Sequence, residues 1–245
     1  MDITQRISPN QASGRQGQTP DFIVCHITGA SFTSAINTIL NRNNQVSYHF
    51  VIAGDGTLVQ AVSVTNTAWA NGTTNSGDNR DNRHSTIPEV RQRRLNANLF
   101  TTSIGFADST NGALTQIQLS KGIDLIRHIR SEVKRVYSHD IPISRSRIIG
   151  HYEINPITKA FCPGPRFPFD EILQRLLEKE PENIARPITP PSISIPATSL
   201  QPSTWAAEAW AWGQSQGLTD GTNPQNPPTR EQMMTLLHRY HKTIA

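Results

Sequence analysis

Two histidines and one cysteine give the clearest chemical signal in this chain. His26 follows an apolar run, and His151 and Cys162 lie near each other much later in the sequence. Two imidazoles and a thiolate suit a borderline-soft ion such as Zn²⁺, and three protein ligands leave a fourth position for water. Such an open position is typical of a catalytic zinc site. Taken singly, however, a histidine after a strand or an isolated cysteine is more often a buried structural residue.

Five short motifs surround these residues in a fixed order. They are Ile23–Thr28, Ser47–Ile52 with Asp55-Gly56, Ala68–Ala70, Ser103–Gly105, and Gly150-His151 through Lys159 to Cys162-Pro163-Gly164. Together they resemble the zinc-dependent N-acetylmuramoyl-L-alanine amidases of type 2, the phage lysozyme-like and peptidoglycan-recognition family. The resemblance implies bacterial peptidoglycan as the substrate and Zn²⁺ as the cofactor, held by His26, His151 and Cys162.

The same resemblance implies how the amide bond between N-acetylmuramic acid and L-alanine is cut. Zinc lowers the pKa of a bound water and polarises the scissile carbonyl. Tyr48 and Lys159 face the metal in this family, so Tyr48 is expected to orient the water or the tetrahedral intermediate. Lys159 is expected to stabilise the oxyanion. Without the resemblance, the sequence would predict a packed strand residue at Tyr48 and a solvated loop lysine at Lys159.

Two positions depart from the family pattern. Ala107 stands where many relatives carry an acidic general base, and alternation along the strand turns the neighbouring Asp108 to the other face. Lys159 stands three residues before Cys162, where some relatives have two. The first departure leaves the general base unassigned, and the second puts the reach of the lysine in question. His49 is expected to be structural, because it alternates away from Tyr48.

Two other functions fit parts of the pattern. A non-catalytic peptidoglycan-binding protein on the same fold is the main alternative, and loss of the ligand cysteine would favour it. Cys162 is present, which argues against that alternative. A zinc peptidase that cuts bonds within the stem peptide is a weaker alternative, which the family resemblance disfavours.

The periodicity of the chain predicts an α/β fold with a central mixed β-sheet flanked by helices, plus a small C-terminal helical module. An apolar run predicts a central strand, two further strands meet at Gly54-Asp55-Gly56, and Thr115 with Gln118 has the spacing of a capping box. The expected strands are 21–28, two within 46–62, 101–107 and 147–151. The expected helices are 33–42, one beginning after Thr115 with an apolar face that includes Val136, and 168–178.

The segment from about 65 to 100 is rich in Asn, Thr, Arg and Gly and has no sustained period. A loop of that length inside a compact domain is usually functional or disordered. We take Trp69, Asn71 and Asn98 as candidates for substrate binding along a groove, with Asn96 as a further candidate. A mobile surface loop is the alternative interpretation.

Three regions are predicted along the chain: a catalytic domain at 1–179, a Pro-rich linker at 180–202, and a small helix–loop–helix module at 203–245. The last resembles a single surface-layer-homology repeat, which is a wall-anchoring module. It predicts cell-wall targeting, with homodimerisation as the alternative. Trp205 and Trp212 are expected to face a partner helix, Trp210 to be exposed, and Gly217 to stop the first helix.

The formal net charge of +4 favours an anionic polymer as partner, and both bacterial walls and nucleic acids qualify. No nucleic-acid motif is present, so we expect no nucleic-acid partner. Two cysteines exclude a disulfide framework, and Cys25 should alternate away from Cys162. The first residues lack the apolar segment of a signal peptide, and no run has the length of a membrane span. We therefore expect synthesis in the cytoplasm and action on the wall after release, as for a phage or prophage endolysin.

Overall fold

The computed structural model describes residues 1–72, 82–178 and 207–217. The chain divides into two compact units, Met1–Glu180 and Pro181–Ala245, which are treated separately below. The predicted linker at 180–202 lies outside the described residues. Within the described ranges, no helix is long and apolar enough to cross a membrane.

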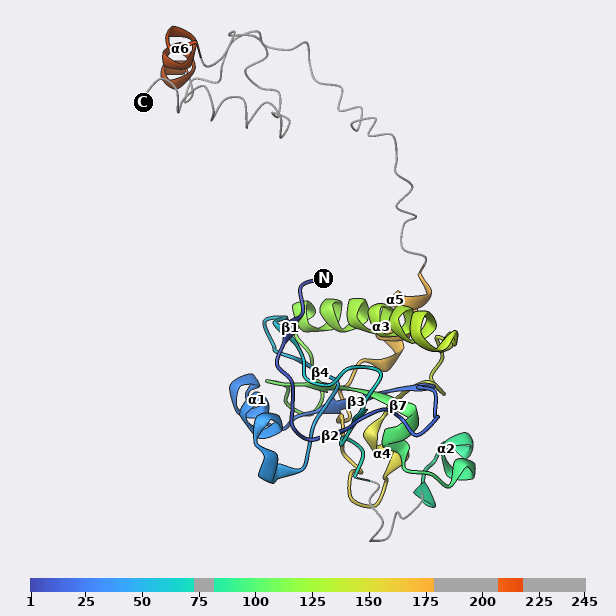
Figure 1. Ribbon diagram of the computed structural model, residues 1–245. Coiled ribbons are helices and arrows are strands. Elements are labelled where there is room, and N and C mark those ends of the chain that lie inside the picture. The colour runs from blue at the N-terminus through green and yellow to red at the C-terminus, as the bar shows by residue number, and fades with distance from the viewer. Residues whose placement is uncertain (73–81, 179–206, 218–245) are drawn as a thin grey trace. The chain divides into compact units, whose positions relative to one another are not determined.

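A six-stranded mixed sheet forms the centre of the first unit, which confirms the predicted fold class (Figure 1). Its strands, in spatial order, are β1 (Thr4–Gln5), β5 (Leu58–Gln60), β4 (Phe50–Ile52), β7 (Thr101–Phe106), β3 (Phe22–Ile27) and β8 (Ile148–Gly150). β4 and β5 are antiparallel, while β4–β7, β7–β3 and β3–β8 are parallel. The predicted hairpin is therefore confirmed, and β3 is the central buried strand that its apolar run predicts.

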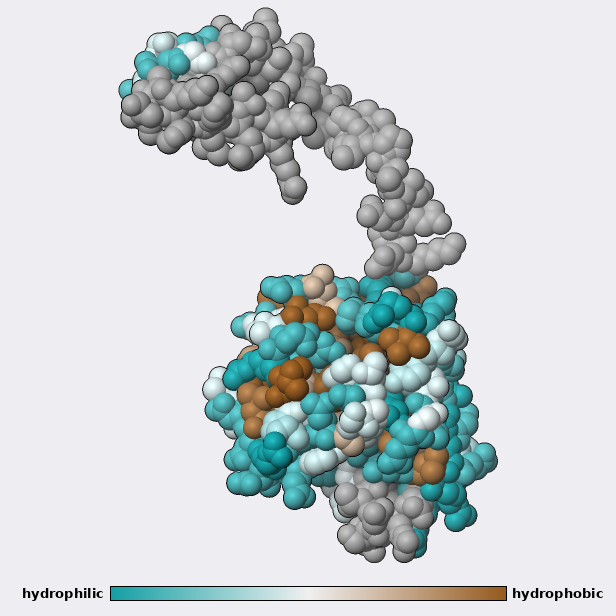
Figure 2. Space-filling view, in the orientation of Figure 1, coloured by the Kyte–Doolittle hydropathy of each residue, from teal (hydrophilic) through white to brown (hydrophobic). Residues whose placement is uncertain are grey.

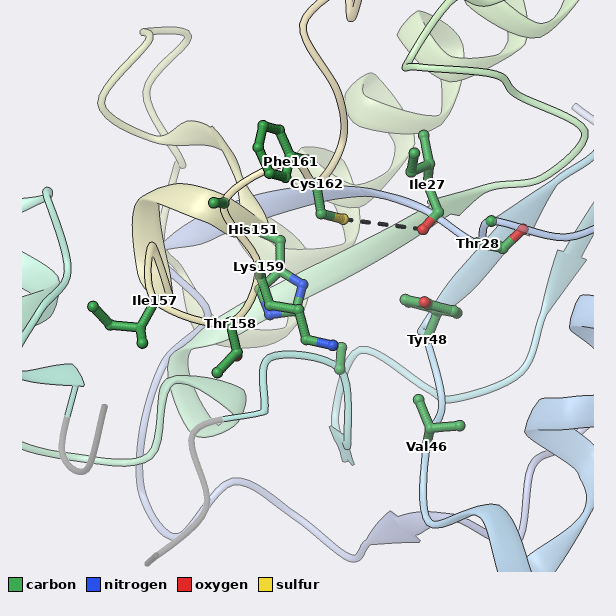
Figure 3. A pocket seen from close by; sticks show the side chains of 13 residues that line it. Ile27, Thr28, Val46, Tyr48, His151, Ile157, Thr158, Lys159, Phe161 and Cys162 are labelled. Atoms are coloured by element: carbon green, nitrogen blue, oxygen red, sulfur yellow. Dashed lines mark hydrogen bonds between the residues drawn. The ribbon is translucent and has the colours of Figure 1, made fainter. Parts of the chain in front are cut away.

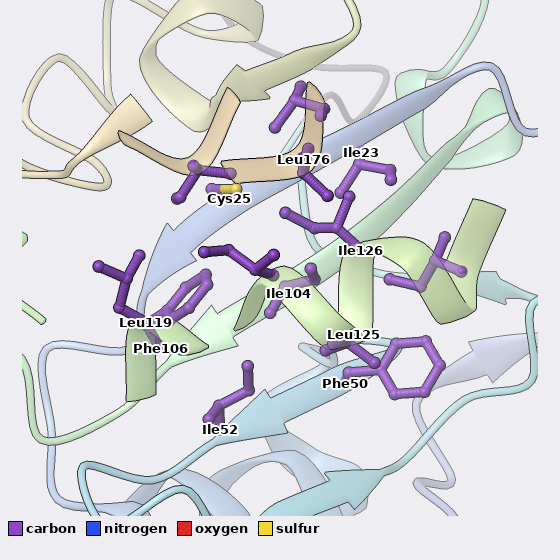
Figure 4. Close-up of a cluster of buried hydrophobic side chains, with 14 of the residues drawn as sticks. Ile23, Cys25, Phe50, Ile52, Ile104, Phe106, Leu119, Leu125, Ile126 and Leu176 are labelled. Atoms are coloured by element: carbon purple, nitrogen blue, oxygen red, sulfur yellow. The ribbon is translucent and has the colours of Figure 1, made fainter. Parts of the chain in front are cut away.

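Three longer helices and two short ones surround the sheet. They are α1 (Phe32–Leu40), α2 (Pro88–Arg93), α3 (Gln116–Tyr137), α4 (His151–Ile154) and α5 (Phe169–Leu177). The largest apolar cluster joins α3 and α5 to one sheet face, and Cys25 is buried within it (Figure 4). Two smaller clusters cover the other face, one with α1 and one with α2. Hydrophilic residues predominate on the face seen in Figure 2, where hydrophobic residues form small separate patches.

The capping of two helices differs in part from what the local sequence predicts. Ser31 caps α1, which begins one residue before the expected start at 33, because its side chain accepts a hydrogen bond from the Ser34 amide. Thr115 caps α3 as predicted, but Gln118 does not close a capping box. The side-chain amide of Gln118 instead donates to the carbonyl oxygens of Ile52 and Ala107, and so connects the helix to the sheet.

The burial of one helix face and the presence of several short elements differ from the prediction. The apolar face of α3 is buried from Leu119 to Val133, but Val136, which was assigned to it, is 37% exposed. The segment 65–100 was expected to be irregular, whereas it contains β6 (Thr67–Ala68), α2 and a 3-10 turn at Ala97–Phe100. β6 pairs with β2 (Gln11–Ala12) in a separate small sheet. These elements are too short to give a periodic sequence signal.

The described part of the second unit is one helix, α6 (Ala207–Ser215). Gly217 follows its end with φ +65°, in agreement with the expected stop. Trp210, which was expected to be exposed, is partly buried, and Trp212 is 51% exposed. Trp205 and the second predicted helix lie outside the described residues.

Candidate metal centre and active site

The topology brings the two histidines together. His26 lies near the end of β3, and His151 directly follows β8, the parallel neighbour of β3. Parallel strands end at the same edge of a sheet, so the two imidazoles meet there. Their Nδ1 atoms are 3.0 Å apart, and both side chains are buried. Alternation along β3 places Cys25 on the opposite face, in the apolar core.

Cys162 completes a three-residue group at this edge. Its Sγ atom is 4.0 Å from Nδ1 of His26, and one ligand atom from each of the three residues lies within 4.8 Å of the others. The main chain holds the cysteine in place, since the Tyr152 amide donates to the Cys162 carbonyl at 2.9 Å. Both cysteines of the chain are free thiols.

Hydrogen bonding prepares His151 to act as a ligand. Its Nε2 atom lies 2.9 Å from the carbonyl oxygen of Asn71, which can only accept, so Nε2 carries the proton. The lone pair of Nδ1 then points toward His26 and Cys162, the arrangement that outer hydrogen bonds give to metal-bound histidines. His26 lacks such an outer hydrogen bond, because its buried Nε2 has no hydrogen-bond partner among the described residues.

The charge states of the histidines suit a metal site. Burial holds the pKa of His26 well below its usual value and lowers that of His151 to about 4. Both imidazoles are therefore neutral at pH 7, as metal ligands must be. Burial raises the pKa of the Cys162 thiol, so metal binding has to displace its proton. Two imidazoles and a thiolate are a donor set that suits Zn²⁺.

A pocket of about 490 Å³ opens over this group (Figure 3). Tyr48 lines it, with its ring centroid 5.1 Å from that of His26. The ring lies close over Gly105, where a Cβ atom would stand 3.0 Å from Cδ2 of Tyr48. Glycine in the Ser-Ile-Gly motif thus makes room for the tyrosine. Burial raises the pKa of Tyr48 above its usual value, so its hydroxyl stays protonated and can donate.

Lys159 also lines the pocket, although its spacing to Cys162 is one residue longer than in some relatives. A turn connects the two residues, in which the Cys162 amide donates to the Lys159 carbonyl at 3.0 Å. The lysine stem runs beside Gly72, and its positive charge contributes to the lowered pKa of both His26 and His151. The ammonium group therefore lies within electrostatic range of both histidines.

The sequence profile of one protein family, described as N-acetylmuramoyl-L-alanine amidase, matches residues 16–165, well over half of the chain. This chain belongs to that family. The match covers every one of the residues that form the pocket and the His–His–Cys group.

Solved structures agree on the fold. A mutant form of PlyL has a TM-score of 0.51 at 17% identity, covering 72% of this chain and 98% of that chain. PlyL itself has a TM-score of 0.50 at 18% identity, covering 72% and 97%. The amidase LysC from Clostridium intestinale URNW reaches 0.48 at 20% identity, covering 72% and 97%. At these identities the likeness to the two PlyL structures shows the fold alone. A comparison with curated proteins finds no significant match.

The amidase pocket is not lined by the three residues predicted to bind substrate. Asn71 is fully buried, and its side-chain amide donates to the hydroxyl of Thr101. Asn98 is 5% exposed, and its side-chain oxygen accepts from the amides of Ala70 and Asn71. Trp69 is partly buried and lies outside the pocket lining. The two asparagines instead hold the turn whose Asn71 carbonyl orients His151. Residue type alone does not indicate this role.

The amidase pocket contains no carboxylate among its described lining residues. Asp108, which follows Ala107, faces away as expected, since its two oxygens accept from the amides of Phe32 and Gly54. His49 is buried beneath the site, where it contacts Arg15 at 2.7 Å and Ser103 at 3.0 Å. This placement agrees with the structural role expected of His49. Burial lowers the pKa of Arg15 to about 10, which leaves the guanidinium charged at pH 7.

The sequence did not identify the other lining residues as part of the site. They are Ile27, Thr28, Gly29, Val46, Ala70, Ile157, Thr158, Ala160 and Phe161. Most are apolar or small, so residue type did not distinguish them from core positions. Ile27, Thr28 and Ala70 lie within the motifs that carry the family resemblance, and Ile157, Thr158, Ala160 and Phe161 are close to Lys159 and Cys162 in the sequence; this nearness was the available signal.

Proposed function

We propose that this amidase hydrolyses the bond between N-acetylmuramic acid and L-alanine in bacterial peptidoglycan, with Zn²⁺ held by His26, His151 and Cys162. The observation that carries the proposal is the convergence of two Nδ1 atoms and one Sγ atom below a pocket lined by Tyr48 and Lys159. Membership of the amidase family supports the substrate class. The nature of the fragments released from digested walls tests the assignment, as set out at the end of the Discussion.

The side chains of the pocket divide the remaining work. When bound, zinc supplies a nucleophile at neutral pH and polarises a carbonyl. The Lys159 ammonium stabilises the negative charge that develops on the carbonyl oxygen, and the Tyr48 hydroxyl donates a hydrogen bond that orients the reacting groups. Hydrolysis must also deliver a proton to the L-alanine nitrogen. Because no described lining residue is a carboxylate, we assign the positioning of that proton to Tyr48 and Lys159.

A non-catalytic peptidoglycan-binding protein is the alternative from another class. Binding alone requires no buried metal ligands, whereas all three are retained in this chain and lie together. The pocket also presents a cation and a phenol beside them, which are the groups that amide hydrolysis needs. These features favour the enzyme.

We also propose that residues 203–245 target the enzyme to the wall, in the manner of an endolysin, after a linker at 180–202. The exposure of Trp212 on α6 supports this role, because exposed aromatic side chains commonly mark binding surfaces. Homodimerisation through the same module is the alternative.

Truncation after residue 179 separates these two roles. All proposed catalytic groups lie within Met1–Glu180, so the shortened protein should cleave soluble muropeptides at a near-normal rate. It should bind and lyse intact walls less well than the full chain. Pelleting with purified walls measures binding, and analytical ultracentrifugation measures the oligomeric state. A dimeric full chain, a monomeric truncation and equal wall binding would show that the module assembles subunits instead.

A further inference from the structure

The loop of residues 155–162 presents a large apolar side chain to solvent beside the candidate active site. Phe161 is 84% exposed, more than any other large hydrophobic residue described. It lines the same pocket as His151 and Cys162, and Figure 3 shows it next to Cys162 at the Ile27 side of the pocket. The other phenylalanines with a described burial are at least partly buried, so Phe161 differs from them in its surroundings.

Hydrogen bonds within the loop hold this residue in place. The Lys159 amide donates to the Asn155 carbonyl at 3.0 Å, and the Cys162 amide donates to the Lys159 carbonyl at 3.0 Å. The Thr158 amide donates to the side-chain oxygen of Asn155 at 3.2 Å. The exposed phenyl ring is thus carried by an ordered turn, and a partner that covers it loses little conformational freedom in doing so.

A substrate bound at the metal-ligand group occupies the pocket that this ring lines. The scissile amide joins two chemically different parts, a sugar that carries a lactyl group and a peptide that begins with L-alanine. A sugar ring offers a flat face of C–H groups, which suits an exposed aromatic face. The first peptide residue offers only a methyl group, and a flexible aliphatic side chain would serve it equally well.

We infer that Phe161 is a specificity-determining residue that forms a platform for the sugar ring of the muramoyl group. The inference rests on the proposed function, since it assumes that a muramoyl peptide occupies the pocket. It assigns the glycan to the side of the pocket where Phe161 and Ile27 lie.

The test measures binding of the two products separately, by isothermal titration calorimetry with the full-length, zinc-loaded protein. One probe is a peptide-free disaccharide that ends in N-acetylmuramic acid, and the other is a sugar-free peptide that begins with L-alanine. Phe161→Ala should raise the Kd of the disaccharide roughly 10-fold, the scale of one aromatic contact, and leave the Kd of the peptide unchanged. Phe161→Trp should retain disaccharide binding, whereas Phe161→Leu should lose it.

Leu177→Ala is the matched control, because Leu177 is 65% exposed but lies on α5, outside the pocket lining. It should change neither Kd. The inference is overturned if the wild-type protein does not bind the disaccharide, if Phe161→Ala leaves that Kd unchanged, or if the peptide Kd rises equally. Zinc content is measured in each variant, and if alanine at this position disturbs Cys162, the leucine and tryptophan variants decide. Wild-type binding without amide cleavage would refute the proposed function and leave this inference standing.

Discussion

Replacing Cys162 with serine is expected to remove zinc from the purified protein and to reduce amidase activity to background. A serine hydroxyl is not ionised at neutral pH and is a harder donor than a thiolate, so two imidazoles would remain as protein ligands. The wild-type protein should contain about one zinc per chain, as expected for a three-ligand catalytic site. Metal analysis by mass spectrometry, with an assay on muropeptides, measures both effects.

Cys25→Ala is the matched control for that substitution. Cys25 is the adjacent residue to His26 but is buried in the core on the opposite face of β3. Its replacement should keep the zinc and the activity, and should reduce the free energy of unfolding by about 1 kcal/mol, as is usual for a small loss of core packing. If Cys162→Ser retains wild-type zinc, the cysteine is not a ligand and the proposed site is wrong.

Tyr48→Phe and Lys159→Ala are each expected to keep zinc and fold but to lower kcat about 10²-fold or more, the scale of one lost oxyanion donor. Both side chains line the pocket above the three ligands. Steady-state kinetics on a soluble muropeptide separates kcat from KM. The expected loss lies mainly in kcat, because the charge that these groups stabilise develops only in the transition state.

Two substitutions elsewhere control for the loss of a hydroxyl or an ammonium group. Tyr152→Phe removes a hydroxyl that lies outside the pocket and accepts a hydrogen bond from Arg145 at 2.8 Å. Lys134→Ala removes an exposed ammonium group on α3 that pairs with Asp140. Neither should lower kcat. Near-full activity in Lys159→Ala would show that the extra residue before Cys162 does move the ammonium out of reach.

Residue type and alternation correctly predicted that His26, His151 and Cys162 lie together. The position of His26 on the face opposite Cys25 follows from the two-residue period of a strand, and the meeting with His151 follows from parallel strands that end together. By contrast, the carbonyl of Asn71 orients His151 through the main chain, which leaves no trace in residue type. Asn71 and Asn98 hold a turn and do not line the pocket, because polar loop residues serve a turn as readily as a substrate.

Other features depended on tertiary contacts that no local pattern records. Gln118 has the spacing of a capping box, yet its side-chain amide donates to the carbonyl oxygens of Ile52 and Ala107, because both lie within reach. Phe161 could not be distinguished from a core phenylalanine, since its exposure follows from the turn between Lys159 and Cys162. Such lining residues can be identified only from the tertiary structure of the pocket.

The chemical identity of the fragments released from purified peptidoglycan tests the central claim most directly. Walls digested with the full-length protein are analysed by mass spectrometry and by amino-terminal labelling, with and without prior removal of metal by a chelator. The account predicts peptides with a free L-alanine amino terminus and glycan strands that keep intact lactyl groups. It also predicts that chelation stops their release and that added Zn²⁺ restores it. New amino termini within the stem peptide, new reducing sugar ends, or release that is indifferent to chelation would contradict it.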